Sequence, residues 1–230
     1  MSLLLIPTQI SENTGTLPPG TIEQAREVDE FIVEDEKSAR RFLKNINSKI
    51  SQENFIFHLL NEHSTDADVS ALLSVIRQQK TIGLLSEAGC PSIADPGAAV
   101  VRMAHEYRIR VVPLTGPSSI FLALMASGLN GQSFVFHGYL PREENRRIQA
   151  LQQLSNEAAR KGYTQIFMEA PYRNQKLFDD ILKAVSPELI LCIAADITSA
   201  EEYIRSMPVA DWKKERPSLH KRPAIFLIGK

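Results

Sequence analysis

The chain has 230 residues, which suits one large domain or two small ones. Apolar residues make up 43 % of it and charged residues 23 %, as is ordinary for a globular protein. The formal net charge of −1 gives no overall positive field that would draw the protein to nucleic acid or to an anionic membrane. Cys90 and Cys192 are too few for a disulfide framework or a cysteine-rich zinc site. Because no signal peptide and no membrane-spanning apolar run is recognisable, we expect a cytoplasmic protein with no membrane partner.

Short apolar runs alternate with helix-like segments along the whole chain. This alternation predicts an α/β protein with a largely parallel sheet. The predicted strands are residues 3–6, 31–33, 55–58, 82–85, 109–114, 134–136, 164–168, 189–194 and 224–228. The predicted helices are residues 21–27 with a Thr21 cap, 38–45, about 66–79, 98–106, 118–126, 142–161, a segment ending near 185, and a short helix within 207–221. We expect two α/β domains, residues 1–115 and 116–230, with a cleft between them.

Two loops rich in glycine and proline follow the predicted strands 82–85 and 109–114. They span residues 86–97 and 115–119. Ligands of open α/β sheets bind at the carboxyl ends of the strands, so both loops should open on the same edge. Gly89 and Gly116 let the backbone approach a ligand closely, and the serines of the second loop can cap the next helix. Each glycine or proline alone is also typical of an ordinary turn, but two such loops together favour a small-molecule pocket.

Acidic residues follow two other predicted strands. Glu34 and Asp35 come after the strand 31–33, and Glu62 comes after the strand 55–58 and just before His63. These acids could share one rim of the sheet, or they could be solvated loop charges and helix caps. The sequence has no G-x-G-x-x-G, no G-x-x-x-x-G-K-[ST], no G-x-S-x-G and no H-x-x-x-H. A dinucleotide fold, a P-loop, an α/β-hydrolase and a catalytic zinc site therefore have no support.

Six segments match, in order along the chain, the motifs of one enzyme family. They are residues 33–42 (A-E-D-T-R-x-T-R-R-L), 86–97 (S-D-A-G-x-P-x-I-S-D-P-G), 111–119 (V-V-P-L-P-G-P-S-A), 126–129 (A-S-G-L), 134–141 (F-x-F-x-G-F-L-P) and 168–173 (Y-E-S-P-H-R). Together they resemble the tetrapyrrole methylase superfamily of S-adenosylmethionine-dependent methyltransferases. The resemblance is strongest to the branch that methylates a cytidine ribose 2′-hydroxyl in bacterial small-subunit ribosomal RNA.

The resemblance implies two α/β domains with S-adenosylmethionine in the cleft between them, usually in a homodimer. By motif match, the residues that border the cofactor would be Pro7, Glu87, Ala88, Gly89, Pro91, Ile93, Gly116, Pro117, Ser118, Ser119, Met168, Ala195 and Ala224. Methyl transfer to a sugar hydroxyl gains from in-line positioning and from a general base. Candidates for that base are Glu34, Asp35, Glu62 and His63, and the sequence does not choose among them.

The segments expected to face the methyl acceptor depart from the family pattern. The family's Gly-Asn pair in the first loop is Ser11-Glu12 here, the Arg of E-D-T-R is Lys37, and the Lys of E-L-T-K is Ser199. Phosphate contacts supply much of the affinity for nucleic acid, so charge supports RNA only weakly. We expect RNA of the small ribosomal subunit as acceptor, with a small-molecule or tetrapyrrole acceptor, or a non-catalytic cofactor-binding protein, as alternatives. A basic rim would favour RNA, and its candidate members are Arg40, Arg41, Lys44, Arg142, Arg146, Arg147 and Arg173.

Overall fold

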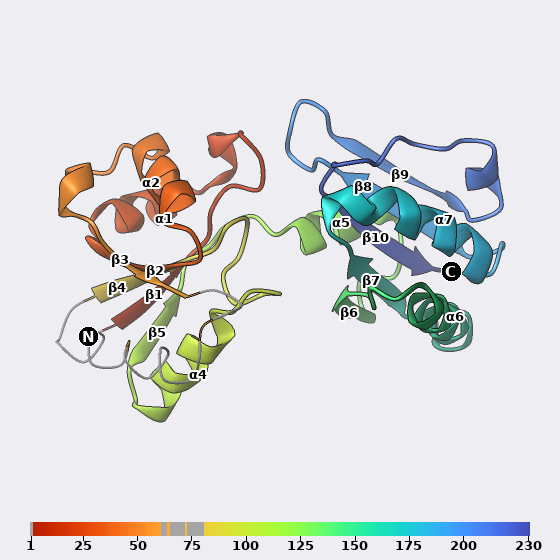
Figure 1. Ribbon diagram of the computed structural model, residues 1–230, viewed down its shortest axis with the longest axis horizontal. Helices are drawn as coiled ribbons and strands as arrows, with labels where there is room; N and C mark the ends of the chain where they lie inside the picture. The colour runs from red at the N-terminus through yellow and green to blue at the C-terminus, as the bar shows by residue number, and fades with distance from the viewer. Residues whose placement is uncertain (1, 61–63, 65–71, 73–80) are drawn as a thin grey trace. The chain divides into compact units, whose positions relative to one another are not determined.

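The computed structural model describes residues 2–60, 64, 72 and 81–230 of the chain. These divide into two compact units, Met1–Ser118 and Ser119–Lys230. Each unit contains a five-stranded sheet that is flanked by helices (Figure 1). The division predicted from the sequence falls between residues 115 and 116, close to this one. Nearly all of the helix predicted over residues 66–79 lies outside the described residues.

The sheet of the first unit is parallel throughout. Its strands are β1 (Ser2–Ile6), β2 (Glu30–Val33), β3 (Ile56–Leu59), β4 (Thr81–Leu85) and β5 (Arg110–Pro113), in the order β3-β2-β4-β1-β5. Its α-helices are α1 (Pro19–Arg26), α2 (Glu36–Asn45) and α4 (Ala98–Glu106), with short 3-10 turns at Thr14–Thr16 and Gln52–Asn54. The parallel register, for example Leu3 beside Ile82 and Val111, places the carboxyl ends of β1, β4 and β5 at one edge.

Helices cover both faces of this first sheet, which explains why its strands are apolar runs without alternation. On one face Leu4 and Phe31 pack with Phe42 of α2. On the other face Leu3 and Ile82 pack with Met103 of α4. The helices packed on the two faces hold this sheet in place, and the loops project from its carboxyl edge.

The predicted cap at Thr21 is wrong, because α1 begins earlier. Pro18 is the residue before the helix and Pro19 is its first residue, a position that suits proline because no amide hydrogen bond is needed there. Thr21 is buried inside the first turn, and its hydroxyl donates a 2.6 Å hydrogen bond to the carbonyl of Thr115. Thr21 thus attaches α1 to the loop that follows β5.

The sheet of the second unit is mixed. Its strands are β6 (Phe134–Tyr139), β7 (Thr164–Met168), β8 (Ile190–Ala195), β9 (Tyr203–Pro208) and β10 (Ala224–Gly229), in the order β6-β7-β10-β8-β9. Only β6 and β7 are parallel, and the other pairs are antiparallel. Its helices are α5 (Ser119–Ser127), α6 (Glu144–Lys161) and α7 (Asn174–Ala184), with 3-10 turns η3 (Pro171–Arg173) and η4 (Asp211–Lys213).

The prediction of a largely parallel sheet therefore holds for the first unit and is wrong for the second. A parallel pair needs a long crossover, usually a helix, whereas a short turn reverses the chain. The connection from β8 to β9 is such a turn, closed by a hydrogen bond from the amide of Ser199 to the carbonyl of Asp196. The strand β9 was not predicted, because it lies at the edge of the sheet and exposes Arg205 and Ser206.

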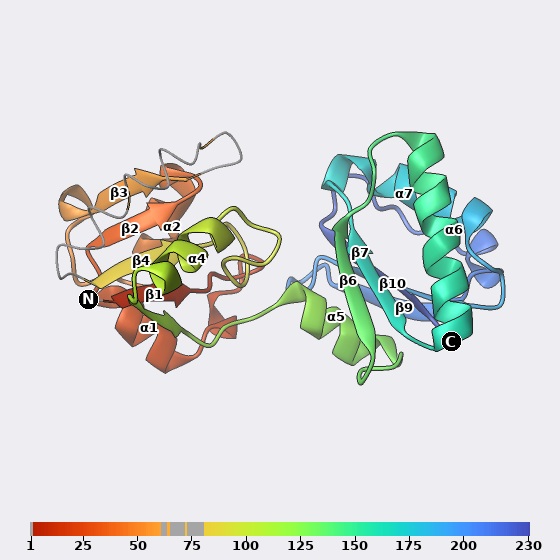
Figure 2. The ribbon, with the colours of Figure 1, turned by 90° about the horizontal axis from the view of Figure 1, so that it is seen from below.

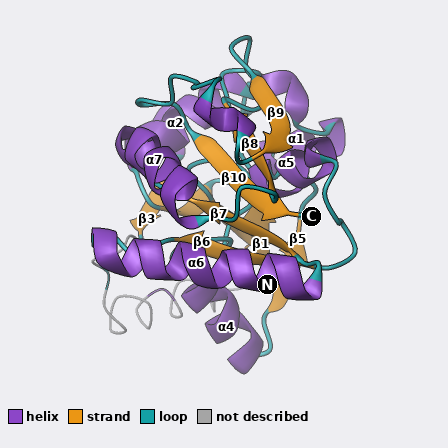
Figure 3. Cartoon of the chain, turned by 90° about the vertical axis from the view of Figure 1, so that its right-hand side faces the viewer, coloured by secondary structure: helices purple, strands orange, loops and turns teal. Residues whose placement is uncertain are grey.

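Helices lie on both faces of the second sheet. Figure 2 shows α5 and α6 on opposite sides of it, and Figure 3 shows α6 and α7 on the side nearer the viewer. Under α6 and α7, Phe167, Phe178 and Trp212 pack in one cluster, while Leu124 of α5 packs with Ile225 on the other face. A buried ion pair joins α6 to α7, with both Nε and Nη2 of Arg147 donating to Asp180, at 2.9 and 2.6 Å.

Candidate functional site

Three loops meet at the carboxyl edge of the first sheet, as the sequence predicted for two of them. The loop after β1 and the loop after β4 exchange two backbone hydrogen bonds between Thr8 and Gly89, at 3.0 and 3.2 Å. The loop after β4 also contacts the loop after β5, because the thiol of Cys90 donates to the carbonyl of Pro117 at 3.5 Å. These links join the loops after β1, β4 and β5 into one continuous surface, called the wall below.

The two predicted glycines allow the loops to pack this closely. Gly89 has a φ of +76°, which favours glycine, and a Cβ there would lie 3.2 Å from the carbonyl oxygen of Pro117. A Cβ on Gly116 would overlap the side chain of Pro7. Both glycines are therefore required by contacts between the loops themselves.

The predicted cofactor residues of the three loops differ in exposure. Glu87 and Ala88 are exposed, and so is Ile93, with 52 % of its surface accessible. Pro7, Gly89 and Pro91 are buried, and Gly116, Pro117 and Ser118 are partly exposed, as is Ser119, the first residue of the second unit. Three predicted contact residues, one of them a large apolar side chain, are thus accessible on this wall.

The backbone of the loop after β4 is strained near Ile93. Ser92 and Ala94 have φ values of +67° and +57°, the left-handed region that residues with side chains rarely adopt. Among the described residues, the Ser92 hydroxyl is buried and has no hydrogen-bond partner. Strained backbone and an unsatisfied polar group concentrate at functional sites, where they are retained for binding.

Glu34 lies at the end of β2 beside the loop after β4. Its pKa is raised from 4.5 to about 7, first by burial, then by the charge and hydrogen bond of Asp95, and then by the charge of Glu87. Glu87 accepts a 2.6 Å hydrogen bond from the Ser38 hydroxyl. Asp95 accepts one from the amide of Gly97, also at 2.6 Å. Glu34 is therefore a carboxyl group that changes protonation near neutral pH, at the edge where the loops meet.

The other candidate bases differ from Glu34. Asp35 is fully exposed and caps α2, accepting a 2.8 Å hydrogen bond from the amide of Ser38. Hydrogen bonds from the backbone and side chain of Ser38 lower the pKa of Asp35. Glu62 and His63 lie outside the described residues. The proximity of Asp95 and Glu87 to Glu34 was not predictable from the sequence, because they belong to a loop distant in the chain.

The predicted cofactor residues of the second unit gather at one edge of its sheet. Because β10 is antiparallel to β7 and β8, its first residues lie beside the last residues of both strands. Ala224 is paired with Ala195, and the next residue of β10 is paired with Met168. Two ion pairs flank this group, Arg173 with Glu169 and Arg222 with Asp196.

The predicted basic rim is only partly present. Arg147 is not a surface cation, since it is 2 % exposed and ion-paired with Asp180. Arg40 pairs with Glu36 at 2.7 Å, so its charge is partly neutralised. Arg146 is exposed and pairs with Glu143.

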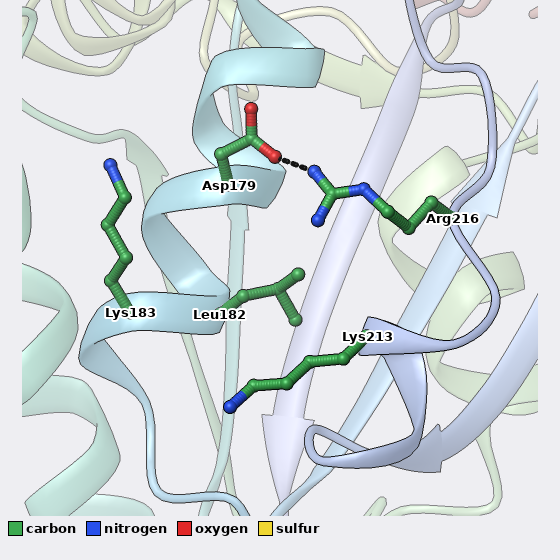
Figure 4. Close-up of a pocket in the computed structure, with 5 residues that line it drawn as sticks. All are labelled: Asp179, Leu182, Lys183, Lys213 and Arg216. Carbon is green, nitrogen blue, oxygen red and sulfur yellow. Dashed lines mark hydrogen bonds and ion pairs between the residues drawn. The ribbon is translucent and has the colours of Figure 1, made fainter.

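A hollow of about 850 Å³ lies on the second unit, between α7 and the segment after β9 (Figure 4). Its lining comprises Asp179, Leu182, Lys183, Lys213 and Arg216. Asp179 and Arg216 form an ion pair, and the amino groups of Lys183 and Lys213 do not point toward one another. Ligand sites bring polar groups together, so this hollow is a weaker candidate than the loop edges.

Two features are absent from the part of the chain that the structure describes. No group of three or more His, Cys, Asp or Glu side chains there is arranged to hold a metal ion. No helix there is long and apolar enough to cross a membrane.

Comparison with known proteins gives consistent results. The sequence model of the family "Tetrapyrrole (Corrin/Porphyrin) Methylases" matches residues 13–212. The ribosomal RNA small subunit methyltransferase I of Vibrio cholerae is 31 % identical, over 98 % of this chain and 76 % of that protein. The protein of that name from Escherichia coli O157:H7 is 30 % identical, over 98 % of this chain and 77 % of that protein.

Two solved structures share the fold. The methyltransferase CobJ superposes with a TM-score of 0.66 at 13 % identity, covering 100 % of this chain and 94 % of the other. Uroporphyrin-III C-methyl transferase from Thermus thermophilus, complexed with S-adenyl homocysteine, gives a TM-score of 0.62 at 14 % identity, covering 100 % and 98 %. This similarity confirms the fold of two α/β units that the motifs imply.

Proposed function

This chain belongs to the tetrapyrrole methylase family, and we propose that it methylates a ribose 2′-hydroxyl of small-subunit ribosomal RNA. The protein is a methyltransferase that uses S-adenosylmethionine, as its motifs predicted. The observation that supports an RNA acceptor is the similarity, along almost the whole chain, to enzymes named for ribosomal RNA. A tetrapyrrole acceptor is supported by the description of the family and by structural neighbours of much lower sequence identity.

We assign cofactor binding to the residues predicted from the motifs in both units. In the first unit, the joined loops present Glu87, Ala88 and Ile93 to solvent on a wall that Gly89 and Gly116 hold together. The unsatisfied Ser92 hydroxyl fits a wall that binds a polar ligand. In the second unit, the assignment rests on the group formed by Met168, Ala195 and Ala224.

The chemistry asked of the chain is positioning and proton transfer. When bound, S-adenosylmethionine supplies an electrophilic methyl group on a positively charged sulfur. Glu34 is the general base in this proposal, because a carboxyl with a pKa of about 7 is near half ionised at neutral pH. It would take the proton of the 2′-hydroxyl as the methyl group passes to that oxygen and its bond to sulfur breaks, leaving S-adenosylhomocysteine, and would then release the proton to water. Burial, together with the charges of Asp95 and Glu87, raises the pKa of Glu34 and makes it a stronger base than an ordinary glutamate.

Two expectations follow from the proposed acceptor and family. We expect the protein to work in the cytoplasm, where ribosomal RNA would be its substrate. The homodimer implied by the family resemblance stays a prediction, which light scattering on the purified protein would test.

Cofactor binding is tested by calorimetric titration with S-adenosylhomocysteine. We expect one site per chain in the wild type. Gly116→Ala should weaken binding because the added methyl group displaces Pro7 from the wall. Gly131→Ala is the matched control, since nothing lies within 4 Å of a Cβ there. If all three proteins bind S-adenosylhomocysteine equally, the loops of the first unit are not part of the cofactor site.

The acceptor is tested with small ribosomal subunits from cells that lack the corresponding methyltransferase. Incubation with radiolabelled S-adenosylmethionine should label their RNA, and mapping should place the methyl group on a ribose. Label on a tetrapyrrole and not on RNA would establish the alternative acceptor. Cofactor binding with no labelled acceptor would indicate a non-catalytic binding protein.

A further inference from the structure

Two large tyrosine side chains are exposed near the predicted cofactor residues of the second unit. Tyr139 is 59 % exposed and Tyr172 is 60 % exposed. Tyr139 is the last residue of β6 and is paired with Met168, the last residue of β7. Tyr172 lies in η3, immediately beyond that same end of β7. Both rings therefore leave the sheet at the edge where Met168, Ala195 and Ala224 gather.

Arg173 is fixed beside these rings. Its guanidinium carbon lies 4.8 Å from the ring centroid of Tyr172, and its Nη1 donates a 2.6 Å hydrogen bond to the Tyr172 hydroxyl. Its Nη2 donates to Glu169 at 2.5 Å, and the Glu169 side chain is 1 % exposed. The hydrogen bond that Arg173 donates to Glu169 is the main cause that raises the pKa of Arg173, and the charges of Glu169, Tyr172 and Tyr139 add to it. A buried carboxylate thus holds a permanent cation against the exposed ring of Tyr172, within electrostatic reach of Tyr139.

We propose that Tyr139, Tyr172 and Arg173 form a platform on which a nucleobase of the RNA substrate stacks. Unpaired bases of RNA are recognised by stacking on aromatic rings and on guanidinium planes, and the exposed tyrosines with the anchored Arg173 supply both kinds of surface. Because Glu169 fixes the guanidinium before RNA arrives, little conformational entropy is lost on binding. The inference rests on the proposed RNA acceptor and extends it, since it names the surface that holds the base.

The position of the platform fits the reaction. A ribose is attached to its base, so holding the base at the edge near Met168 holds the 2′-hydroxyl close to the residues assigned to the methyl donor. Stacking accepts any base, so the platform supplies affinity and orientation, and base identity is read elsewhere.

The test compares Tyr172→Ala and Tyr139→Ala with Tyr172→Phe, which keeps the ring. Tyr163→Ala is the control, because Tyr163 is also exposed, at 40 %, but precedes β7 at the opposite end of that strand. The first probe is a fluorescently labelled oligocytidylate of about ten nucleotides, a length typical of single-strand binding sites. The second probe is a ribose-phosphate oligomer of equal length that carries no bases. Binding is followed by fluorescence anisotropy with S-adenosylhomocysteine present.

We expect each alanine variant to weaken oligocytidylate binding by about tenfold or more, the usual effect of removing one stacking ring. Binding of the base-free oligomer should be unchanged. Tyr172→Phe should keep most of the oligocytidylate affinity because it keeps the ring and loses only the hydrogen bond from Arg173, and Tyr163→Ala should match the wild type. With small ribosomal subunits as substrate, the alanine variants should raise KM more than they lower kcat. Far-ultraviolet circular dichroism of each variant checks that the fold is retained.

Two results would overturn the platform. In the first, wild-type protein methylates small subunits but the alanine variants keep its KM and its affinity for oligocytidylate, so the proposed function stands and the platform does not. In the second, the alanine variants lose affinity equally for both oligomers, which would make the tyrosines part of a backbone contact. If wild-type protein neither binds RNA nor methylates it, the proposed function itself fails and the platform fails with it.

Discussion

Replacing Glu34 with glutamine tests the unusual carboxyl group at the first loop edge. The change removes the ionisable group, while the glutamine amide can still donate a hydrogen bond to Asp95 in place of the protonated carboxyl. In the wild type, the pKa rises from 4.5 to about 7 on folding. Below pH 4.5, Glu34 is neutral in both states and its ionisation costs nothing. As the pH rises from 4.5 toward 7, Glu34 ionises in the unfolded chain while it stays protonated in the folded protein. The free energy of unfolding therefore falls across this window, and the loss is complete above it.

The magnitude follows from the pKa values. The full difference between the pKa of 4.5 in the unfolded chain and the pKa of about 7 in the folded protein corresponds to about 3 kcal/mol of unfolding free energy. Because Glu34 is only partly buried, water screens this cost, and we expect about 1–2 kcal/mol. Glu34→Gln should therefore be more stable than the wild type by that amount at pH 8, and the gain should largely vanish at pH 5.

The assay is urea unfolding at both pH values, followed by far-ultraviolet circular dichroism. Tryptophan fluorescence is unsuitable, because the single tryptophan, Trp212, belongs to the second unit. Glu23→Gln, an exposed residue of α1, is the control and should show no gain at either pH. An equal gain at pH 5 and pH 8, or none, would refute the account of Glu34. In the methylation assay the wild-type rate should rise with pH to a plateau above about 7, and Glu34→Gln should lower it by about a hundredfold or more.

Three other changes have definite expected results. Arg147→Ala leaves the buried Asp180 without its partner and should lower the free energy of unfolding by about 3–5 kcal/mol in urea titrations. Gly83→Ala removes a glycine from the middle of β4, but its Cβ would lie 2.7 Å from the Phe31 ring, so it should destabilise the protein by about 1–3 kcal/mol by the same measurement. Burial raises the pKa of the Cys90 thiol, so its alkylation by iodoacetamide at pH 8, followed by mass spectrometry, should be slower than that of glutathione. Results of the opposite sign would contradict the packing or burial described for each site.

Local patterns in the sequence predicted many of the elements well. The helix over residues 98–106 and the strand over 164–168 have the predicted bounds, since each is a compact apolar pattern between clear turn residues. The glycine- and proline-rich segments after two predicted strands indicated loops at one carboxyl edge, and the structure confirms that these loops meet. Such features depend mainly on residues that are neighbours in the chain.

Features that depend on distant residues were not predictable. The sequence could not distinguish a surface arginine from Arg147, whose partner Asp180 lies on another helix. It could not assign a protonation state to Glu34, because the charges that raise its pKa come from the loop after β4. The direction of the strands in the second sheet follows from its connections, and the polar edge strand β9 gave too weak an apolar pattern to be recognised.

The order of strands in the second sheet has a consequence for how the protein is made. The central strand β10 lies between β7 and β8, yet it follows both of them along the chain. As the ribosome releases the polypeptide, β7 and β8 therefore emerge before the strand to which both are hydrogen-bonded. Until β10 emerges, their unpaired edges can bind strands of other nascent chains, a known route to aggregation. The second unit should thus depend more than the first on chaperones that shield nascent chains, because β1, β2 and β4 of the first unit can pair before synthesis ends.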